Sequence, residues 1–421
     1  MLDIKFIRAN AAKIKEAAKN KNIKVDIDEL LKVDEARRES QGKIDQLRTK
    51  RNELAAAAKG GKPAPAQIEE GKKLKDEIAA FEKKSEEIEN QYQDLMEKIP
   101  NLYHPDTPIG KNDSENKEIE RVGEPTKFKF TPKDHVTLGK ELDVLDFETA
   151  AQVTGAGFFY LKNELALLEF ALAQFALEKL VKRGFTPFST PDLAKSFIMR
   201  GTGYNPRGNE EQIYEIKGED TSLIATAEIT LGGYLANKTL EEEDLDIKYV
   251  GFSHCFRKEA GAYGKESRGL YRVHQFSKVE MFVFARPETS EKRHQEMKEI
   301  EKEIYKELGI PFRVMEICSG DLGGAAFRKY DLEAWMPMKN DWGEITSCSN
   351  CTDFQARRLN IKYKTKDGRT EYVHTLNGTA ITSSRAPLVI LENFQQADGS
   401  VIIPKVLRKY LPGKMKAIKK K

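Results

Sequence analysis

The chain has 421 residues, of which 33% are charged, 39% hydrophobic and 9% aromatic, with a formal net charge of +3 at pH 7. This length allows two or three domains, and the near-neutral charge gives no case by itself for a nucleic-acid partner. The first ten residues contain no apolar run of signal-peptide length, and Glu169 and Gln174 interrupt the most apolar window, 165–177, so we expect no membrane segment. Four cysteines in a chain of this length do not indicate a disulfide framework, which fits a reducing compartment, so we expect the protein in the cytoplasm.

Residues 26–99 are nearly all helix formers, interrupted once by the Gly/Pro stretch at 60–66. Alternating steps of three and four meet six apolar residues in nine from Leu30 to Ala58, and seven in nine from Gly71 to Ile99. Two such stripes around a turn predict an antiparallel coiled-coil hairpin that projects roughly 40–50 Å.

Charge is unevenly distributed along this hairpin. Residues 37–75, nearer the turn, hold 11 Lys/Arg and 5 Asp/Glu, whereas residues 26–36 and 76–99 together hold 4 and 13. A basic tip suits contact with a phosphate backbone, but charge on long exposed helices also serves solubility. Both interpretations remain open.

The composition changes after Pro100. Residues 101–134 are rich in Pro, Gly, Asn and charge, which predicts a linker with one edge strand. Further on we expect helices at 162–183, 288–308, 351–362 and 377–394, and strands near 213–217, 248–256, 271–285, 312–317, 328–336 and 343–347. Little helix separates the strands between 248 and 285, so we expect an α+β domain with an antiparallel sheet flanked by helices. The sequence has no GxxxxGK[ST] motif and no GxGxxG after a strand.

Four short motifs occur in order in this second half. They are GFTPFSTP after the helix at 162–183, TAE at 226–228, FRKE with a Gly-rich loop and GLYRVHQFSKVE at 256–280, and LNGTAITSSRAPLVILENFQ at 376–395. With the helical hairpin in front, they make the chain resemble the seryl-tRNA synthetase family of class II aminoacyl-tRNA synthetases over essentially its full length. The resemblance implies a tRNA-binding coiled-coil arm at 1–100, a linker at 101–134, a catalytic domain at 135–421, and a homodimer formed through the helix at 162–183.

The resemblance implies that the chain activates serine with ATP and transfers it from seryl-adenylate to the 3′ end of tRNA(Ser), with tRNA(Sec) left open as a second acceptor. In adenylyl transfer the protein mainly positions two anions and neutralises the charge that develops. Arg257 is the expected bridge between the serine carboxylate and the α-phosphate, and Arg385 the expected γ-phosphate ligand. These two arginines are the expected catalytic residues, because a guanidinium fork binds two oxygens at once.

The other expected roles also come from the resemblance. Glu259 accepts from the adenine amino group, Phe276 stacks on the base, and Glu280 accepts from the serine hydroxyl. Glu344 and Ser347 hold Mg²⁺ between the ATP phosphates. The expected ATP ligands are Arg257, Lys258, Glu259, Arg272, Val273, Phe276, Glu344, Ile345, Thr346, Ser347 and Arg385. The expected serine ligands are Thr226, Ala227, Glu228, Arg257, Glu280, Asn377 and Thr379. The expected tRNA ligands are Arg37, Arg38, Lys43, Arg48 and Arg51.

Several alternatives stay open. Arg268 and Arg272 are either phosphate contacts or solvated charges, and the basic tail at 405–421 is either a solubilising end or a tRNA contact. Glycines at 261, 264 and 269 are expected to let the loop close over ATP. No zinc is expected, because CSNC at 348–351 has no second ligand pair at suitable spacing. His274 is expected to be a hydrogen-bonded structural residue.

Two other functions compete with the first. One is a paralogue that activates an amino acid and loads a carrier protein, and the other is a non-catalytic tRNA-binding relative. The intact set of arginines and glutamates argues against the second alternative, because an inactive relative has no physical need for buried charged ligands. The helical hairpin argues against the first. The segment AITSSR is more polar than the form common in the family. The sequence therefore does not indicate how the side chains pack around the serine pocket.

Overall fold

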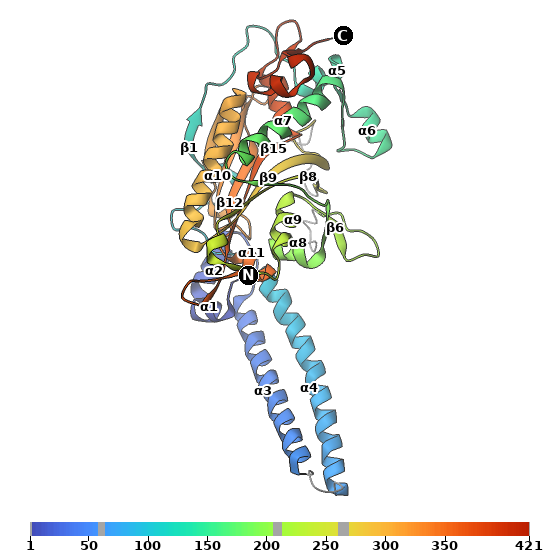
Figure 1. The fold of residues 1–421 in the computed structure, drawn as a ribbon, viewed down its shortest axis with the longest axis vertical. Coiled ribbons are helices and arrows are strands. Elements are labelled where there is room, and N and C mark those ends of the chain that lie inside the picture. The colour runs from blue at the N-terminus through green and yellow to red at the C-terminus, as the bar shows by residue number, and fades with distance from the viewer. Residues whose placement is uncertain (1, 58–63, 205–212, 260–268, 421) are drawn as a thin grey trace. The chain divides into compact units, whose positions relative to one another are not determined.

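A computed structural model describes residues 2–57, 64–204, 213–259 and 269–420 (Figure 1). The chain divides into two compact units, Met1–Pro100 and Asn101–Lys421. Arg268, Gly261 and Gly264, on which the sequence placed a phosphate contact and loop closure, lie outside the described residues, as does most of the expected turn of the hairpin.

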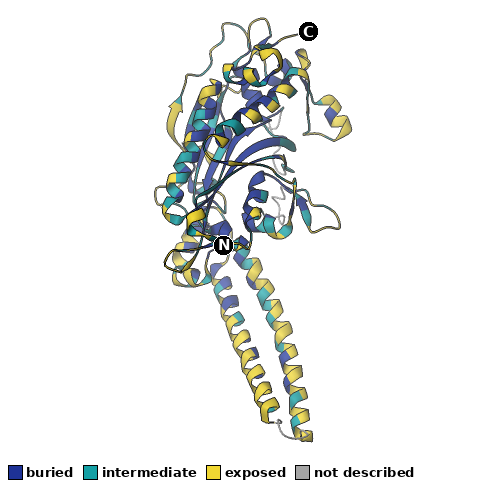
Figure 2. Cartoon of the chain, in the orientation of Figure 1, coloured by how far each residue is buried: buried dark blue, intermediate teal, exposed yellow. Residues whose placement is uncertain are grey.

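The first unit is a helical hairpin with two short helices before it. Helices α1 (Ile4–Ala9) and α2 (Ala11–Asn20), which the sequence did not predict, precede α3 (Ile27–Ala57) and α4 (Pro65–Lys98). The two long helices pack along the predicted stripes, burying Leu30, Val33, Ser40, Ile44 and Leu47 on α3 and Leu74, Ile78, Tyr92 and Met96 on α4. Figure 2 shows the other faces of both helices exposed. The narrow buried seam is that of a coiled coil.

The second unit is built on an eight-stranded sheet in the order β1-β10-β11-β12-β15-β9-β8-β4. Neighbouring strands are antiparallel except for β4 and β8, which are parallel. This confirms the predicted α+β architecture. The strands span Lys117–Val122 (β1), Thr186–Ser189 (β4), Ile247–Phe256 (β8), Gln275–Ala285 (β9), Phe312–Glu316 (β10), Arg328–Met336 (β11), Asp341–Asn350 (β12) and His374–Thr382 (β15).

Helices flank this sheet, and short strands pair outside it. The helices are α5 (His135–Glu141), α6 (Glu148–Val153), α7 (Asn163–Val181), α8 (Ser196–Thr202), α9 (Ala227–Tyr234), α10 (Pro287–Leu308), α11 (Phe354–Leu359) and α12 (Arg385–Asn393). The short strands are β2 (Leu145–Asp146), β3 (Tyr160–Leu161), β5 (Leu193–Lys195), β6 (Thr221–Leu223), β7 (Thr239–Glu241), β13 (Lys362–Lys364), β14 (Thr370–Tyr372), β16 (Val401–Ile402) and β17 (Ala417–Ile418). One large core joins α7, α10 and α12 to the sheet.

Two sequence-based element predictions were wrong. The expected helix at 377–394 is a strand, β15, followed by the shorter helix α12. The reason is that 374–382 pairs on both sides, with β9 and with β12, and that its threonines and isoleucine also favour a strand. The expected strand at 213–217 is an isolated bridge from Glu215 to Ser222. The helix expected at 351–362 is shortened to α11 and ends in the left-handed residue Asn360.

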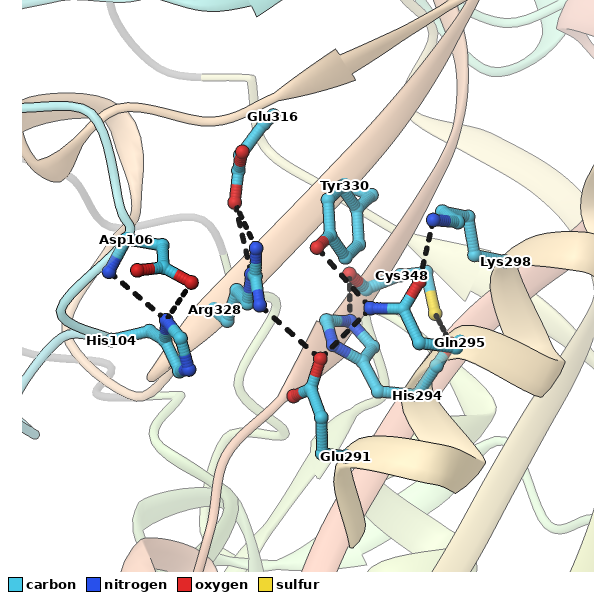
Figure 3. Close-up of polar contacts among 10 residues, drawn as sticks. All are labelled: His104, Asp106, Glu291, His294, Gln295, Lys298, Glu316, Arg328, Tyr330 and Cys348. Atoms are coloured by element: carbon cyan, nitrogen blue, oxygen red, sulfur yellow. Dashed lines mark hydrogen bonds and ion pairs between the residues drawn. The ribbon is translucent and has the colours of Figure 1, made fainter. Parts of the chain in front are cut away.

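Helix α10 is fixed to the sheet by polar as well as apolar contacts (Figure 3). His294 is fully buried, with Nε2 3.0 Å from the carbonyl oxygen of Cys348 on β12, and burial lowers the pKa of His294 to about 4. Arg328 of β11 contacts Glu291 of α10 and Glu316 of β10. One face of β11 and β12 is thereby held by α10. Side chains alternate along a strand, so the intervening residues face the other way.

A buried acid, Glu301, lies on the same helix. Glu301 has no exposed surface, and its Oε2 accepts a hydrogen bond of 2.7 Å from Thr346 Oγ1. Burial raises the pKa of Glu301 well above its ordinary value. A Cβ placed on Gly378 of β15 would lie 2.9 Å from Glu301 Oε1, so the carboxyl fills the space that the glycine leaves. Asn377 and Thr379, on either side of Gly378, therefore point to the opposite face of the sheet.

Candidate active site

A cavity of about 440 Å³ opens on the sheet face opposite α10. Strands β9, β12 and β15 provide its floor, the start of α12 closes one side, and residues 202–204 and 322–326 close another. The cavity is lined by fourteen of the predicted ATP and serine ligands: Glu228, Arg257, Glu259, Arg272, Val273, Phe276, Glu280, Glu344, Ile345, Thr346, Ser347, Asn377, Thr379 and Arg385. Segments separated by more than a hundred residues thus meet at one site.

Three of the predicted ligands do not line this cavity. Thr226 is fully buried as the N-cap of α9, where its side chain accepts from the backbone N–H of Glu228 at 3.2 Å. Ala227 packs into the apolar cluster beneath α9. Lys258 Nζ lies 6.0 Å from the ring centroid of Tyr214. The TAE segment thus places one side chain, Glu228, in the cavity, and the cap holds that side chain in position.

The cationic end of the cavity carries two ion pairs. Arg385 Nη1 lies 3.0 Å from Glu344 Oε1, and its guanidinium stands 4.9 Å from the ring centroid of Tyr271. Arg272 Nη1 lies 2.6 Å from Glu259 Oε2. Arg257 follows β8, donates to the carbonyl of Ala225 at 3.4 Å, and stands 5.3 Å from the ring centroid of Phe276. Each guanidinium is therefore held in place before any anion arrives.

Glu344 and Ser347 lie three residues apart on β12 and both line the cavity. Burial opposes ionisation of Glu344, but the charges of Arg385 and Lys329 outweigh it and lower the pKa of that carboxyl. A carboxylate with a nearby hydroxyl is a donor set that suits Mg²⁺ shared with substrate phosphates. Among the residues that the structure describes, no group of three or more His, Cys, Asp or Glu side chains forms a metal site.

The other end of the cavity holds two buried carboxylates, Glu228 and Glu280. Glu228 Oε1 accepts from Gln355 Nε2 at 2.7 Å and from Asn377 Nδ2 at 3.1 Å, and Oε2 accepts from Tyr204 at 3.2 Å. Burial, with the nearby charge of Glu280, raises the pKa of Glu228 to about 7. Glu280 instead pairs with a lysine, Lys278, at 2.6 Å. The two acids thus differ in their partners.

Sequence reasoning missed three residues of this end. Lys278 stands two residues before Glu280 and two after Phe276, so the period of a strand places all three side chains on one face. That signal was present in the sequence. Tyr204 and Gln355 reach Glu228 from distant loops and helices, and no local pattern indicates them. His274 Nδ1 lies 2.8 Å from the carbonyl oxygen of Arg257, a backbone contact that suits its expected structural role.

The five predicted tRNA ligands lie on α3 and differ in how far they are engaged. Arg37 lies 3.4 Å from Asp34 and 3.5 Å from Glu89, and its guanidinium stands 4.3 Å from the ring centroid of Tyr92. Arg38 lies 3.5 Å from Asp34, and Arg48 lies 2.8 Å from Glu82. Lys43 and Arg51 are exposed and form no ion pair with any described residue. Arg37 thus also connects the two long helices, whereas the ion pair of Arg38 lies within α3.

An antiparallel sheet with one arginine after β8 and another at the start of α12, both facing a shared cavity, defines the core of a class II aminoacyl-tRNA synthetase. Comparison with family models agrees. Residues 213–394 match the tRNA synthetase class II core domain (G, H, P, S and T), and residues 1–103 match the seryl-tRNA synthetase N-terminal domain.

Individual similar proteins indicate one family within this class. The chain is 50% identical over 416 residues to the serine--tRNA ligase of Treponema denticola, covering 97% of this chain and 98% of that one. It is 49% identical over 416 residues to the serine--tRNA ligase of Dictyoglomus turgidum, covering 98% of each. The crystal structure of seryl-tRNA synthetase from Pyrococcus horikoshii complexed with ATP superposes with a TM-score of 0.89 at 40% identity, covering 100% of both chains. The chain belongs to the seryl-tRNA synthetase family of ligases.

Two further observations concern the whole described chain. Within residues 2–57, 64–204, 213–259 and 269–420, no helix combines the length and the apolar character needed to span a membrane. The four cysteines, Cys255, Cys318, Cys348 and Cys351, are buried free thiols.

Proposed function

We propose that this chain joins L-serine to ATP as seryl-adenylate, releases pyrophosphate, and transfers the seryl group to the 3′ end of tRNA(Ser). The observation that carries the proposal is one cavity with arginines at one end and two differently partnered carboxylates at the other. The first end suits phosphates and a carboxylate, and the second suits an ammonium and a hydroxyl. tRNA(Sec) is the proposed alternative acceptor.

Arg257 and Arg385 are the proposed catalytic residues. A serine carboxylate oxygen forms a bond to the α-phosphorus while the bond from that phosphorus to the bridging oxygen breaks, and pyrophosphate leaves with the electron pair. Arg257, between the two ends, would bind the carboxylate and the α-phosphate together, and Arg385 would bind the γ-phosphate. Fixed guanidinium groups lower the barrier by holding two anions together and neutralising charge as it develops.

The nucleotide is proposed to lie over β9 and β12. Phe276 would stack on adenine, Glu259 would accept from its amino group, and Arg272 would contact a phosphate. The remaining proposed ATP ligands are Lys258, Val273, Ile345 and Thr346. Glu344 and Ser347 would hold Mg²⁺, which when bound screens the phosphate charges. The relative from Pyrococcus horikoshii was crystallised with ATP, which supports this assignment.

Serine is proposed to bind at the other end of the cavity. Glu228 would take the ammonium, and Glu280 with Thr379 would take the hydroxyl. Asn377 would orient the amino end, and Thr226 and Ala227 would act by positioning Glu228. A site that hydrogen-bonds a hydroxyl rejects alanine by a factor of ~10⁴ or more, because its buried polar groups are left unpaired.

The hairpin is proposed to bind tRNA through Arg37, Arg38, Lys43, Arg48 and Arg51, and the enzyme to act in the cytoplasm as a homodimer. Helix α7 supports the dimer, because Phe170 is 65% exposed and Leu167 and Val181 are also exposed on it. Apolar side chains grouped on one helix are typical of an interface. The proposed division of the chain is an arm at 1–100, a linker at 101–134 and a catalytic domain at 135–421.

The decisive experiment is ATP–pyrophosphate exchange with each of the twenty amino acids, with Arg257→Ala as the control. Exchange with serine alone, lost in the variant, is the expected result. Exchange with another amino acid would contradict the substrate, and none at all would favour the non-catalytic alternative. Deletion of residues 37–90 then tests the arm: exchange should survive and tRNA charging should be lost. Unchanged charging would show that the arm does not hold tRNA.

A further inference from the structure

Lys278 is a cation buried inside the serine end of the cavity. It lies on β9 between Phe276 and Glu280, and its side chain is 6% exposed. The side chain of Glu280 is 2% exposed, and the two charged atoms, Lys278 Nζ and Glu280 Oε2, are 2.6 Å apart. Burying an unpaired charge costs free energy, so we expect a lysine at this position to have a role in the cavity.

A third residue closes the arrangement. Thr379 of β15 stands opposite Glu280 in the sheet register. Its Oγ1 donates to Glu280 Oε2 at 3.1 Å and accepts from Lys278 Nζ at 3.3 Å. The lysine and the threonine therefore both approach the same carboxylate oxygen, and they fix the plane of the carboxylate. Two paired strands carry the three groups, so their geometry does not depend on a loop.

The other carboxylate of this end is arranged differently. The described residues that donate to the carboxylate of Glu228 are Gln355, Asn377 and Tyr204, and all three are neutral. Two further cations of the cavity lie toward its phosphate end, where Arg272 pairs with Glu259 and Arg385 with Glu344, and Arg257 lies between the two ends. Glu280 thus contacts a fixed cation directly, whereas the side chains that hydrogen-bond to Glu228 are neutral.

We propose that Lys278 determines which group of serine each carboxylate binds. Because of Lys278, Glu280 binds the serine hydroxyl and Glu228 binds the ammonium. The proposal rests on the proposed function, because it presumes that serine is the substrate. Lys278 offsets much of the charge of Glu280, so Glu280 attracts an ammonium less than Glu228 does, yet the carboxylate still accepts a hydrogen bond from a hydroxyl. The substrate then enters in one orientation. Lys278 is a positioning residue that acts through Glu280.

The test is Lys278→Met, which keeps the length of the side chain and removes its charge. In ATP–pyrophosphate exchange we expect the KM for serine to rise by ~10–100-fold and the preference for serine over alanine to fall by at least ~10-fold. Alanine never uses Glu280, so its exchange should change less. The KM for ATP should stay within about twofold. Lys248→Met is the matched control, because Lys248 forms a 2.6 Å ion pair with Glu296 outside the cavity.

A double-mutant cycle with Glu280→Gln shows whether Lys278 acts through Glu280. The expected result is that Lys278→Met adds little to the loss of serine preference in Glu280→Gln, because Glu280→Gln has already removed the carboxylate charge with which Lys278 pairs. Additive losses, an unchanged preference in Lys278→Met, or an equal rise in the KM for ATP would overturn the proposal. If Lys278→Met alone does not fold, the double variant, which buries no unpaired charge, is compared with Glu280→Gln in the same way. Wild-type exchange that does not depend on serine would instead overturn the proposed function.

Discussion

The affinity for serine should depend on the ionisation of Glu228. Burial is the main cause that raises the pKa of this carboxyl to about 7, and the charge of Glu280 adds to it. The ammonium of serine binds the ionised form. Affinity should therefore be greatest above pH 7 and should fall as the pH drops through about 7.

The magnitude follows from the titration of one group. With a pKa near 7, the ionised fraction of Glu228 changes by about tenfold between pH 8 and pH 6. The KM for serine should rise by about the same factor, on the order of 1.4 kcal/mol of binding free energy. Serine itself keeps its charges across this range, so the change belongs to the protein.

The assay is serine-dependent ATP–pyrophosphate exchange at half-unit steps from pH 6 to 8.5, with saturating ATP. The KM for ATP is measured in parallel, because burial also raises the pKa of Asp331, beside Ser347 in the β11–β12 ladder, to about 7. Glu228→Gln should bind serine weakly and lose the pH dependence of its KM. A serine KM that is flat across the range, or that moves equally in Glu228→Gln, would refute the assignment of the ammonium to Glu228.

Three further predictions concern other residues. Glu301 keeps its proton in the folded state and loses it above about pH 4.5 when unfolded, so the stability of the protein falls as the pH rises. Glu301→Gln should remove up to ~1.4 kcal/mol per pH unit of that slope in urea unfolding. An unchanged slope would show that the carboxyl of Glu301 ionises in the folded protein. Although burial opposes it, hydrogen bonding and charge from Arg8, with Arg37, lower the pKa of Asp34, so its contribution is present at neutral pH and is lost as the pH falls below about 3.8. Asp34→Asn should therefore destabilise the hairpin by about 1–3 kcal/mol at pH 7 and by less near pH 3, as followed by circular dichroism; equal loss at both values would count against the charge pairing. Phe276→Ala should raise the KM for ATP by ~5–100-fold through lost base stacking and leave the KM for serine nearly unchanged, whereas an equal rise in both would make Phe276 a packing residue.

Much of the fold could be predicted because its periods are local. The stripes from Leu30 to Leu47 and from Leu74 to Tyr92 correspond to the buried seam of α3 and α4. The register of the sheet could not be predicted in this way. One helix was predicted at 377–394, although the β-branched residues in the first part of that range favour a strand, and pairing with β9 and β12 decides the outcome.

In the cavity, too, only the residues that lie close together in the sequence could be predicted to meet. Arg257, Glu259 and Phe276 lie on adjacent segments of one motif, so their meeting could be expected from sequence. Gln355 and Tyr204 could not be expected, because each reaches Glu228 from an element with no sequence relation to it. Charge pairing could not be predicted either: Arg37 was predicted as a tRNA ligand, and its contacts with Asp34, Glu89 and Tyr92 were not foreseen.

The ion pairs Arg385–Glu344 and Arg272–Glu259 have a consequence for how the site behaves between reactions. A cluster of bare guanidinium groups would repel itself and would collect any phosphate from solution. Here Arg385 and Arg272 each already contact a carboxylate, so a triphosphate that binds them must displace an internal anion, and only the difference between the two interactions remains as affinity. Simple phosphates, with fewer oxygens to offer, compete poorly in that exchange. We therefore expect the empty site to bind simple phosphates more weakly than a site with unpaired guanidinium groups would.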